Sequence, residues 1–228
     1  MATIKLFVSN SLRAVLSDLL PQFERASGHA VAVSYDPAKV MLARIEKGET
    51  ADVVVLGGSA IDSLVKQGKI AAASRRVLAR CGVGIGTRAG APRPDIGTVE
   101  AFKRMLLEAK SVAYTQEGAS GIHFSGLIER LEIAGPVTAK AVRRPGGLIG
   151  ELVVAGQADI AVQQIPELLA VPGLELVGPL PGELQQVTVS SAGIFSASKQ
   201  PQAAQALLDF LSTPAAARVM KARGFESA

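Results

Sequence analysis

Three short turns of small polar residues offer the clearest chemistry in this sequence. Each follows an apolar, strand-like segment and precedes a helical one. They are Ser9-Asn10-Ser11, Gly57-Gly58-Ser59 and Gly118-Ala119-Ser120-Gly121. At such a turn the first N–H groups of the helix favour an anion, and small side chains let that anion approach the backbone. We therefore predict an anion site that includes Ser9, Asn10, Ser11, Gly58, Ser59, Ser120 and Gly121.

Larger polar side chains near the ends of the same strands could complete the site. The candidates are Tyr35, Lys39, His123, Arg143, Arg144 and Gln163. Arg143 and Arg144 follow a predicted strand over 138–142 and precede Pro-Gly-Gly, a loop that could hold a guanidinium over a carboxylate. Two alternatives stay open: the arginines as a solvated surface pair, and His123 as a packed helix histidine.

Several other kinds of site are not expected. Two histidines and one cysteine, Cys81 in an apolar segment, are too few for a zinc site or a disulfide, so we predict no metal and no cofactor. The net charge is +4, Trp is absent and the basic residues are scattered, which argues against nucleic acid. No apolar window reaches membrane-spanning length, so we expect no membrane insertion.

Strand-like and helical segments alternate along the chain, as in α/β proteins. The two halves follow one plan, in which a strand, a small polar turn and a helix lead to an Ala-Asp that opens a buried strand. Ser9 lies 43 positions before Asp52, and Thr115 lies 44 before Asp159. Two long strand-like runs, 78–86 and 186–195, are predicted to cross between the halves. The expected lobes are 1–80 plus 192–228, and 81–191.

Helix signals support this layout. Leu12, Val15, Leu16, Leu19, Leu20 and Phe23 recur with helical period. Ser11 is the predicted N-cap of that helix, and Gly28 its stop. Thr98 is predicted to cap a helix over 99–110, and Thr213-Pro214 to begin the last helix.

The chain resembles the molybdate-binding-protein-like group of type 2 periplasmic binding proteins over nearly its full length. The resemblance rests on Asn10-Ser11-Leu12, on 43–52, on 118–121, on 156–162 and on the closing helices from Pro201 to Gly224. It implies an α/β fold of two lobes, each a mixed, mostly parallel sheet flanked by helices, with two crossing strands as hinge. Ser11 and Ser120 match family positions. A second family serine is replaced in Pro37-Ala38-Lys39-Val40, and the family's later tyrosine falls on Gln163.

The resemblance leaves three functions open. The first is a substrate-binding protein of an ABC transporter that closes two lobes on an oxyanion or organic polycarboxylate, with a permease as partner. The second is an enzyme like aconitate isomerase, which is built on the same fold and needs a base such as His123 or Lys39. The third is molybdate or tungstate binding. A regulator's effector domain would need a helix-turn-helix, and none precedes Thr3.

The sequence also gives expectations for compartment and assembly. No signal-peptide pattern precedes the first strand-like segment, so a native start at Met1 predicts a cytoplasmic protein. A leader removed upstream of Met1 would predict a periplasmic one. We expect a monomer.

Overall fold

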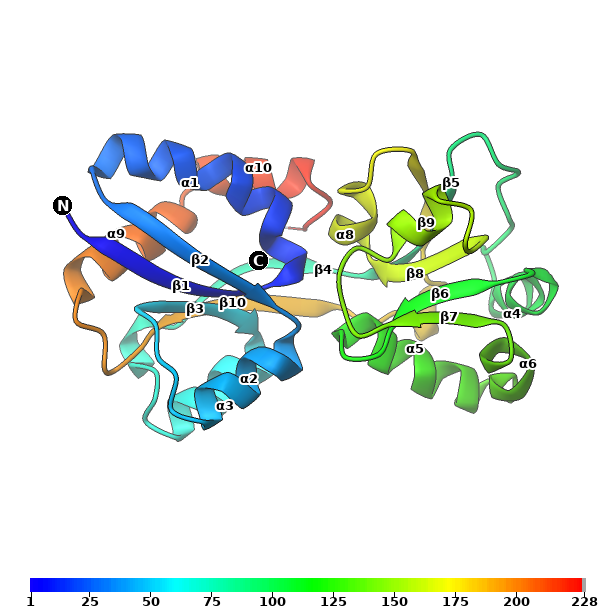
Figure 1. Cartoon of the computed structure of the whole chain (residues 1–228), viewed down its shortest axis with the longest axis horizontal. Coiled ribbons are helices and arrows are strands. Elements are labelled where there is room, and N and C mark those ends of the chain that lie inside the picture. Colours follow the sequence, from blue (N-terminus) through cyan, green and yellow to red (C-terminus); the bar gives the residue numbers. More distant parts are fainter. Residues whose placement is uncertain (227–228) are drawn as a thin grey trace. The chain divides into compact units, whose positions relative to one another are not determined.

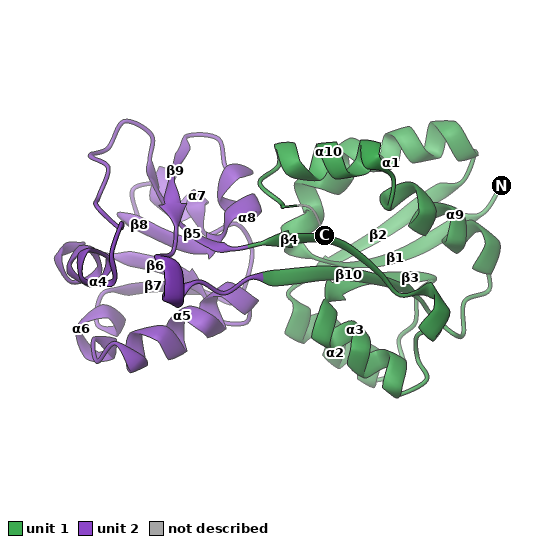
Figure 2. Cartoon of the chain, turned by 180° about the vertical axis from the view of Figure 1, so that it is seen from behind, with its two compact units in different colours: residues 1–81, 188–228 green, residues 82–187 purple. Residues whose placement is uncertain are grey.

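The computed structural model describes residues 1–226, which form two compact units (Figure 2). Unit 1 combines residues 1–81 with the segment from Thr188 onward, and unit 2 is Gly82–Val187. The chain therefore passes between the units twice, after Cys81 and after Val187. Within the described residues no helix has both the length and the apolar character needed to cross a membrane.

Unit 1 is built on a five-stranded sheet. Its strands, in spatial order, are β2 (Ala30–Asp36), β1 (Thr3–Ser9), β3 (Val53–Gly57), β10 (Thr188–Ile194) and β4 (Arg76–Cys81). β1 runs parallel to β2 and β3, whereas β10 runs antiparallel to β3 and β4. The carboxyl ends of the three parallel strands therefore meet at one edge of the sheet.

Helices cover both faces of this sheet (Figure 1). The helices of one face are α1 (Arg13–Ser27), α9 (Pro201–Leu211) and α10 (Pro214–Ala222), and those of the other are α2 (Ala38–Glu46) and α3 (Gly58–Lys66). Strand alternation divides the core between them, because Leu6 and Val8 pack toward α1 while Phe7 packs toward α2 and α3. Short 3-10 turns occupy Asn10–Leu12 and Ala72–Ser74.

Unit 2 repeats this plan. Its strands, in spatial order, are β7 (Ala141–Arg144), β6 (Val112–Thr115), β8 (Ile160–Gln164), β5 (Val83–Arg88) and β9 (Leu174–Pro179). One face carries α4 (Val99–Glu108), α5 (Ala119–Arg130) and α6 (Ala134–Thr138), and the other carries α7 (Gly150–Val154) and α8 (Ile165–Leu169). A 3-10 turn lies at Gly182–Leu184. Three parallel strands are again followed by an antiparallel one.

The shared Ala-Asp of the two halves has a structural role. Asp52 accepts hydrogen bonds from the backbone N–H of Lys5 (2.8 Å) and from Ser198 Oγ (2.6 Å). Asp159 accepts from the backbone N–H of Lys110 at 2.9 Å. Each carboxylate thus ties the start of β3 or β8 to its neighbouring strand, at the edge opposite the carboxyl ends.

Most predicted helix limits are confirmed. Gly28 ends α1 with a left-handed φ of 71°, and Thr98 and Thr213 accept hydrogen bonds from the N–H groups of Ala101 and Ala216. Ser11 is wrong as the N-cap of the first helix. A 3-10 turn intervenes, and α1 begins at Arg13 with Leu12 as its N-cap.

Three other predictions need correction. The run 78–86 is two strands, β4 and β5, which belong to different sheets and separate at Gly82. Residues 188–191, assigned above to the second lobe, belong to unit 1 because β10 pairs with β4 from Thr188 onward. The strand expected over 138–142 begins only at Ala141, after α6. Two short elements of unit 2 were not predicted: β9, the edge strand of its sheet, and α8, which follows β8.

Gln185 joins the two chain crossings at the boundary of unit 2. Its side-chain oxygen accepts the N–H of Val83 (2.8 Å), and its amide nitrogen donates to the Val83 carbonyl (2.9 Å). A Cβ on Gly82 would lie 2.8 Å from the same amide nitrogen, so the contact requires glycine there. The side chain therefore acts like an extra strand partner for Val83.

We expect Gln185→Ala to lower the free energy of unfolding by about 2 kcal/mol, because it removes both hydrogen bonds and leaves the Val83 N–H without this partner, while the Val83 carbonyl still accepts from the Leu180 N–H. Chemical denaturation would measure the change. Gln186→Ala is the matched control, since that neighbouring side chain is exposed and should change stability by less than about 0.5 kcal/mol. Equal effects of the two substitutions would contradict this role for Gln185.

Candidate functional site

The first candidate turn follows β1. Ser9 Oγ and Ser11 Oγ lie 3.3 Å apart, and Ser11 is buried. No side chain caps the 3-10 turn, so its first N–H groups keep their capacity to bind an acceptor, whereas the N–H of Arg13 at the start of α1 donates to the carbonyl of Asn10. Asn10 lies half-buried between the two serines. The turn therefore combines hydroxyls with uncapped backbone donors, as an anion requires.

A cation lies beside this turn. Arg13 is the first residue of α1, a position where the helix dipole disfavours positive charge. Its guanidinium carbon lies 4.1 Å from the centroid of the Tyr35 ring, and no carboxylate within residues 1–226 forms an ion pair with it. Burial raises the pKa of Tyr35, and the charge of Arg13 partly offsets this. Arg13 thus keeps its charge available to an anion.

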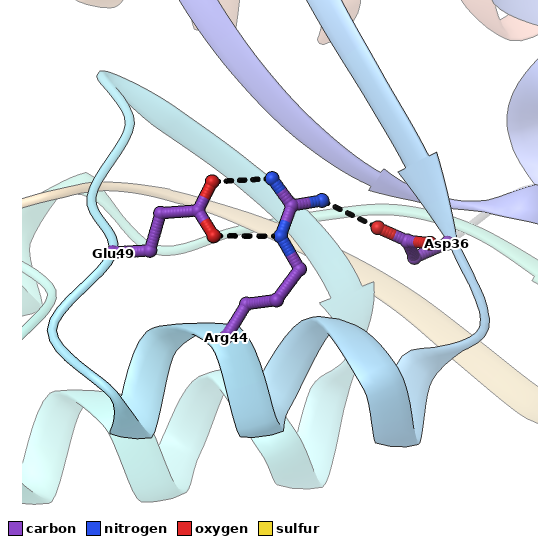
Figure 3. A network of polar contacts seen from close by, with 3 residues as sticks. All are labelled: Asp36, Arg44 and Glu49. Carbon is purple, nitrogen blue, oxygen red and sulfur yellow. Dashed lines mark hydrogen bonds and ion pairs between the residues drawn. The ribbon is translucent and has the colours of Figure 1, made fainter.

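The second turn of unit 1 connects β2 to α2. Asp36 ends β2, Lys39 is exposed in the first turn of α2, and no side chain caps that helix. Asp36 is paired with Arg44, which also binds Glu49 (Figure 3). The predicted residues Tyr35 and Lys39 therefore belong to the same strand end and loop.

The third turn connects β3 to α3. A Cβ on Gly58, the first residue of α3, would lie 3.3 Å from Ser191 Oγ and 3.7 Å from Arg75 Nη2. Ser191 is fully buried, and its hydroxyl has no hydrogen-bond partner among the described residues. The start of α3 is thus flanked by an unpaired hydroxyl and by a guanidinium, which also binds Asp62. Gly58 and Ser59 were predicted here, whereas Ser191 and Arg75 were not.

In unit 2 the corresponding turn connects β6 to α5. Thr115 ends β6, is 3% exposed, and its hydroxyl also lacks a partner within residues 1–226. Cβ atoms on Gly118 and Gly121 would lie 2.4 and 2.7 Å from this hydroxyl, so only glycine fits at both positions. Ser120 is buried in the first turn of α5, which no side chain caps. The two orphaned hydroxyls thus come from different strands, Thr115 from the end of β6 and Ser191 from within β10, but each lies beside the start of a helix.

His123 is anchored in unit 2. Its Nε2 lies 2.9 Å from the carbonyl oxygen of Leu184, which can only accept, so Nε2 carries the proton. The other ring nitrogen, Nδ1, is then the one that could accept a proton. The structure thus supports the packed interpretation of His123 and leaves it one chemically useful atom.

Arg143 and Arg144 are the last two residues of β7, whereas the sequence predicted that they lie in the loop after the strand. They pair in register with Tyr114 and Thr115, so Arg144 lies beside the orphaned threonine. Successive strand residues point to opposite faces, so the two side chains diverge. Arg144 lies 3.8 Å from Glu151 in an exposed pair.

Gln163 holds the backbone of unit 2. Its oxygen accepts the N–H of Ile149 (2.9 Å) and its nitrogen donates to the carbonyl of Gly147 (2.7 Å). It is 1% exposed. Gln163 therefore positions the loop after β7. Its amide oxygen and nitrogen are both hydrogen-bonded to the backbone, whereas the sequence predicted that this side chain binds the ligand.

Glu167 was missed. It stands three residues after Gln164, the N-cap of α8, and accepts hydrogen bonds from the Gln164 N–H and the Gln163 side chain. Burial raises the pKa of this carboxyl to about 8, although both hydrogen bonds oppose the rise. The signal for it was a glutamate three residues after the N-cap, which supplies the backward half of a capping box, although the N-cap Gln164 does not cap the helix with its side chain.

A cavity of about 890 Å³ in unit 2 lies at the opposite edge of its sheet, lined by Arg88, Lys110 and Asp159 among others. The amino ends of β6 and β8 meet there. No uncapped helix start supplies backbone donors among its lining residues, so the cavity lacks the features that the turns share. The candidate site therefore lies at the carboxyl edges of the sheets.

Two known proteins are similar to this chain in sequence over nearly its full length. An aconitate isomerase from a Pseudomonas species is 34% identical over 230 residues, 98% of this chain and 87% of that protein. The molybdate-binding protein of Azotobacter vinelandii is 25% identical over 232 residues, 98% and 90% of the two chains.

Solved structures show the same fold. The periplasmic molybdate-binding protein of Azotobacter vinelandii superposes with a TM-score of 0.82 at 19% identity, covering 99% of both chains. The sulfate-binding protein SubI of Mycobacterium tuberculosis gives 0.79 at 18% identity, covering 100% of this chain and 88% of that one. The family model described as bacterial extracellular solute-binding protein matches residues 4–226. The chain therefore belongs to the family of bacterial extracellular solute-binding proteins.

Proposed function

We propose that this protein binds a small organic anion, a di- or tricarboxylate, at the carboxyl edges of its two sheets. The orphaned hydroxyls carry the proposal. Thr115 Oγ1 and Ser191 Oγ are both buried without a hydrogen-bond partner in the described chain. A buried unsatisfied hydroxyl costs about 1–3 kcal/mol, and an anion at the adjacent helix start would accept a hydrogen bond from it. Both units supply such a turn.

The cations favour carboxylates over a compact oxyanion. Arg13 and Lys39 stand beside the turns of unit 1, and Arg143 is the last residue but one of β7, in register with Tyr114 of β6. A planar guanidinium matches a carboxylate with two parallel hydrogen bonds. The loop at Pro37-Ala38-Lys39 also lacks the serine of the molybdate-binding pattern. Several separated cations suit an anion with several separated charges.

Calorimetric titration with citrate, cis- and trans-aconitate, molybdate and sulfate would test this proposal. We expect binding of the tricarboxylates. Molybdate displacing them, or no binding of any organic acid, would overturn it.

Single-hydroxyl variants test the observation that carries the proposal. We expect Thr115→Val and Ser191→Ala each to weaken binding about ten-fold, because a charge-assisted hydrogen bond is lost. Neither should lower the free energy of unfolding, since each removes an unsatisfied group. Ser17→Ala, an exposed hydroxyl on α1, is the control and should change neither quantity. Lower stability with unchanged affinity would show that the two hydroxyls are structural.

The relatives suggest a transport role and a catalytic alternative. As a substrate-binding protein it would work outside the cytoplasm with an ABC-transporter permease. The 34% identity to an aconitate isomerase favours, as second candidate, isomerisation of a tricarboxylate. One carbon of the substrate would lose a proton, the double bond would shift, and the proton would return to the other end of the allylic unit. Nδ1 of His123, or Lys39, is the proposed base.

Ultraviolet absorbance separates these two candidates. Interconversion of cis- and trans-aconitate by the protein would establish the enzyme. Measurable binding without turnover would leave the transport role.

A further inference from the structure

An acidic residue lies at the edge of the sheet where the anionic ligand is proposed to bind, and its negative charge would oppose that binding. Asp36 is the last residue of β2, and its register partner in β1 is Ser9, the start of the first anion turn. A free carboxylate at this edge would repel an anion. Asp36 is not free, because Arg44 Nη1 donates a hydrogen bond to its Oδ2 (Figure 3).

Arg44 is itself held in place from two further sides. Its Nε donates to Glu49 Oε2 at 2.7 Å and its Nη2 donates to the other oxygen, so Glu49 binds the guanidinium with both oxygens. The guanidinium carbon also lies 4.7 Å from the centroid of the Phe7 ring. Glu49 and Asp36 raise the pKa of Arg44, which therefore stays charged.

This arrangement leaves the N–H groups in the first turn of α2 available to a ligand. The helix begins at Ala38, its N-cap is Pro37, and no side chain caps it. Asp36 stands one position before this N-cap, where a free carboxylate would attract the positive end of the helix and Lys39. Because Asp36 is bound to Arg44 instead, those N–H groups and the exposed Lys39 have no carboxylate competing for them.

We propose that Arg44 is a positioning residue that neutralises Asp36 and holds it away from the start of α2, so that this turn and Lys39 are available to the anionic ligand. This inference rests on the anion binding proposed above. It assigns Glu49 the task of fixing the guanidinium, and it places Arg44 outside direct contact with the ligand.

The test is a double-mutant cycle of Arg44→Gln, Asp36→Asn and the combination, titrated with trans-aconitate by calorimetry. At low ionic strength we expect Arg44→Gln to weaken binding about ten-fold, because the Asp36 charge is uncovered. Asp36→Asn should change affinity by less than about two-fold, and the combined variant should return to within about two-fold of the wild type. Added salt of about 0.5 M should reduce the Arg44→Gln defect, since it screens the repulsion.

Stability provides the control. Arg44→Gln and the combined variant both lose the contact with Glu49, so the midpoint temperature of thermal unfolding should fall by a similar amount in both. Only Arg44→Gln should lose affinity for the anion. Equal loss of affinity in both variants, or a defect insensitive to salt, would show that Arg44 only supports the fold. Wild-type binding with no change in Arg44→Gln would overturn this inference alone. No wild-type binding of any organic anion would overturn it together with the proposed function.

Discussion

Replacing Gly121 by alanine is expected to lower the free energy of unfolding by about 3 kcal/mol, the upper range for overpacking. Gly121 lies in the first turn of α5, and a Cβ there would stand 1.7 Å from the backbone oxygen of Thr115 and 2.6 Å from its carbonyl carbon. Backbone atoms cannot rotate away as a side chain can. The start of α5 must therefore move from the end of β6, and binding of the proposed anion should be lost with it. Chemical denaturation and anion titration would measure the two effects.

The same helix offers a matched control. Gly126 also lies within α5, and a Cβ there meets no atom within 4 Å. Gly126→Ala should therefore stabilise the protein by up to about 1 kcal/mol through helix propensity, with anion affinity unchanged. If the two alanine variants proved equally stable, the close contact between α5 and the end of β6 would be refuted.

The second large effect concerns the buried carboxyl of Glu167. Its pKa in the folded protein is raised from 4.5 to about 8, chiefly by burial. Between these values the folded protein retains a proton that the unfolded chain has released. Stability of the wild type should therefore fall as pH rises through this window, by up to about 1.4 kcal/mol per pH unit. Above about pH 8 both states are ionised, and the loss should level off.

Glu167→Gln replaces the titratable carboxyl by a neutral amide, whose oxygen can still accept a hydrogen bond from the Gln164 N–H. The variant should match the wild type near pH 4.5 and exceed its stability increasingly toward pH 8, by several kcal/mol at most. Urea unfolding of both proteins from pH 4.5 to 8.5 gives the difference, and the acidic end serves as the internal reference. A difference independent of pH would mean that Glu167 ionises in the folded state like an exposed carboxyl.

Much of the fold could be predicted because its signals are local. The apolar residues of α1 recur with helical period, and Val15, Leu16, Leu19 and Phe23 are all buried as that period requires. The Ala-Asp pairs marked the two halves correctly, since each aspartate ties equivalent strands together. The predictions failed where pairing with a distant strand decided the outcome. Residues 78–86 look like one apolar strand, but their partners lie in two different sheets.

The candidate site was predictable only in its turns. Glycine and serine after a strand are visible along the sequence, and Gly58, Ser59, Ser120 and Gly121 lie at helix starts as expected. Ser191 was overlooked because it sits inside a strand, far along the chain from Gly58. Gln163 was assigned to the ligand because it lies near the end of a predicted strand and matches the family's tyrosine. The sequence did not show that its amide is hydrogen-bonded to Gly147 and Ile149.

The sequence by itself determined the α/β class, the two related halves and the helix starts that favour an anion, because backbone conformation and burial follow from neighbouring residues. Only the tertiary structure decided which polar groups are already paired. Arg44 covers Asp36, Gln185 holds Val83 from 102 positions away, and the hydroxyls of Thr115 and Ser191 are left without partners within residues 1–226. A hydrogen bond depends on distances of a few ångströms between segments that the chain separates widely, and residue order alone does not specify those distances.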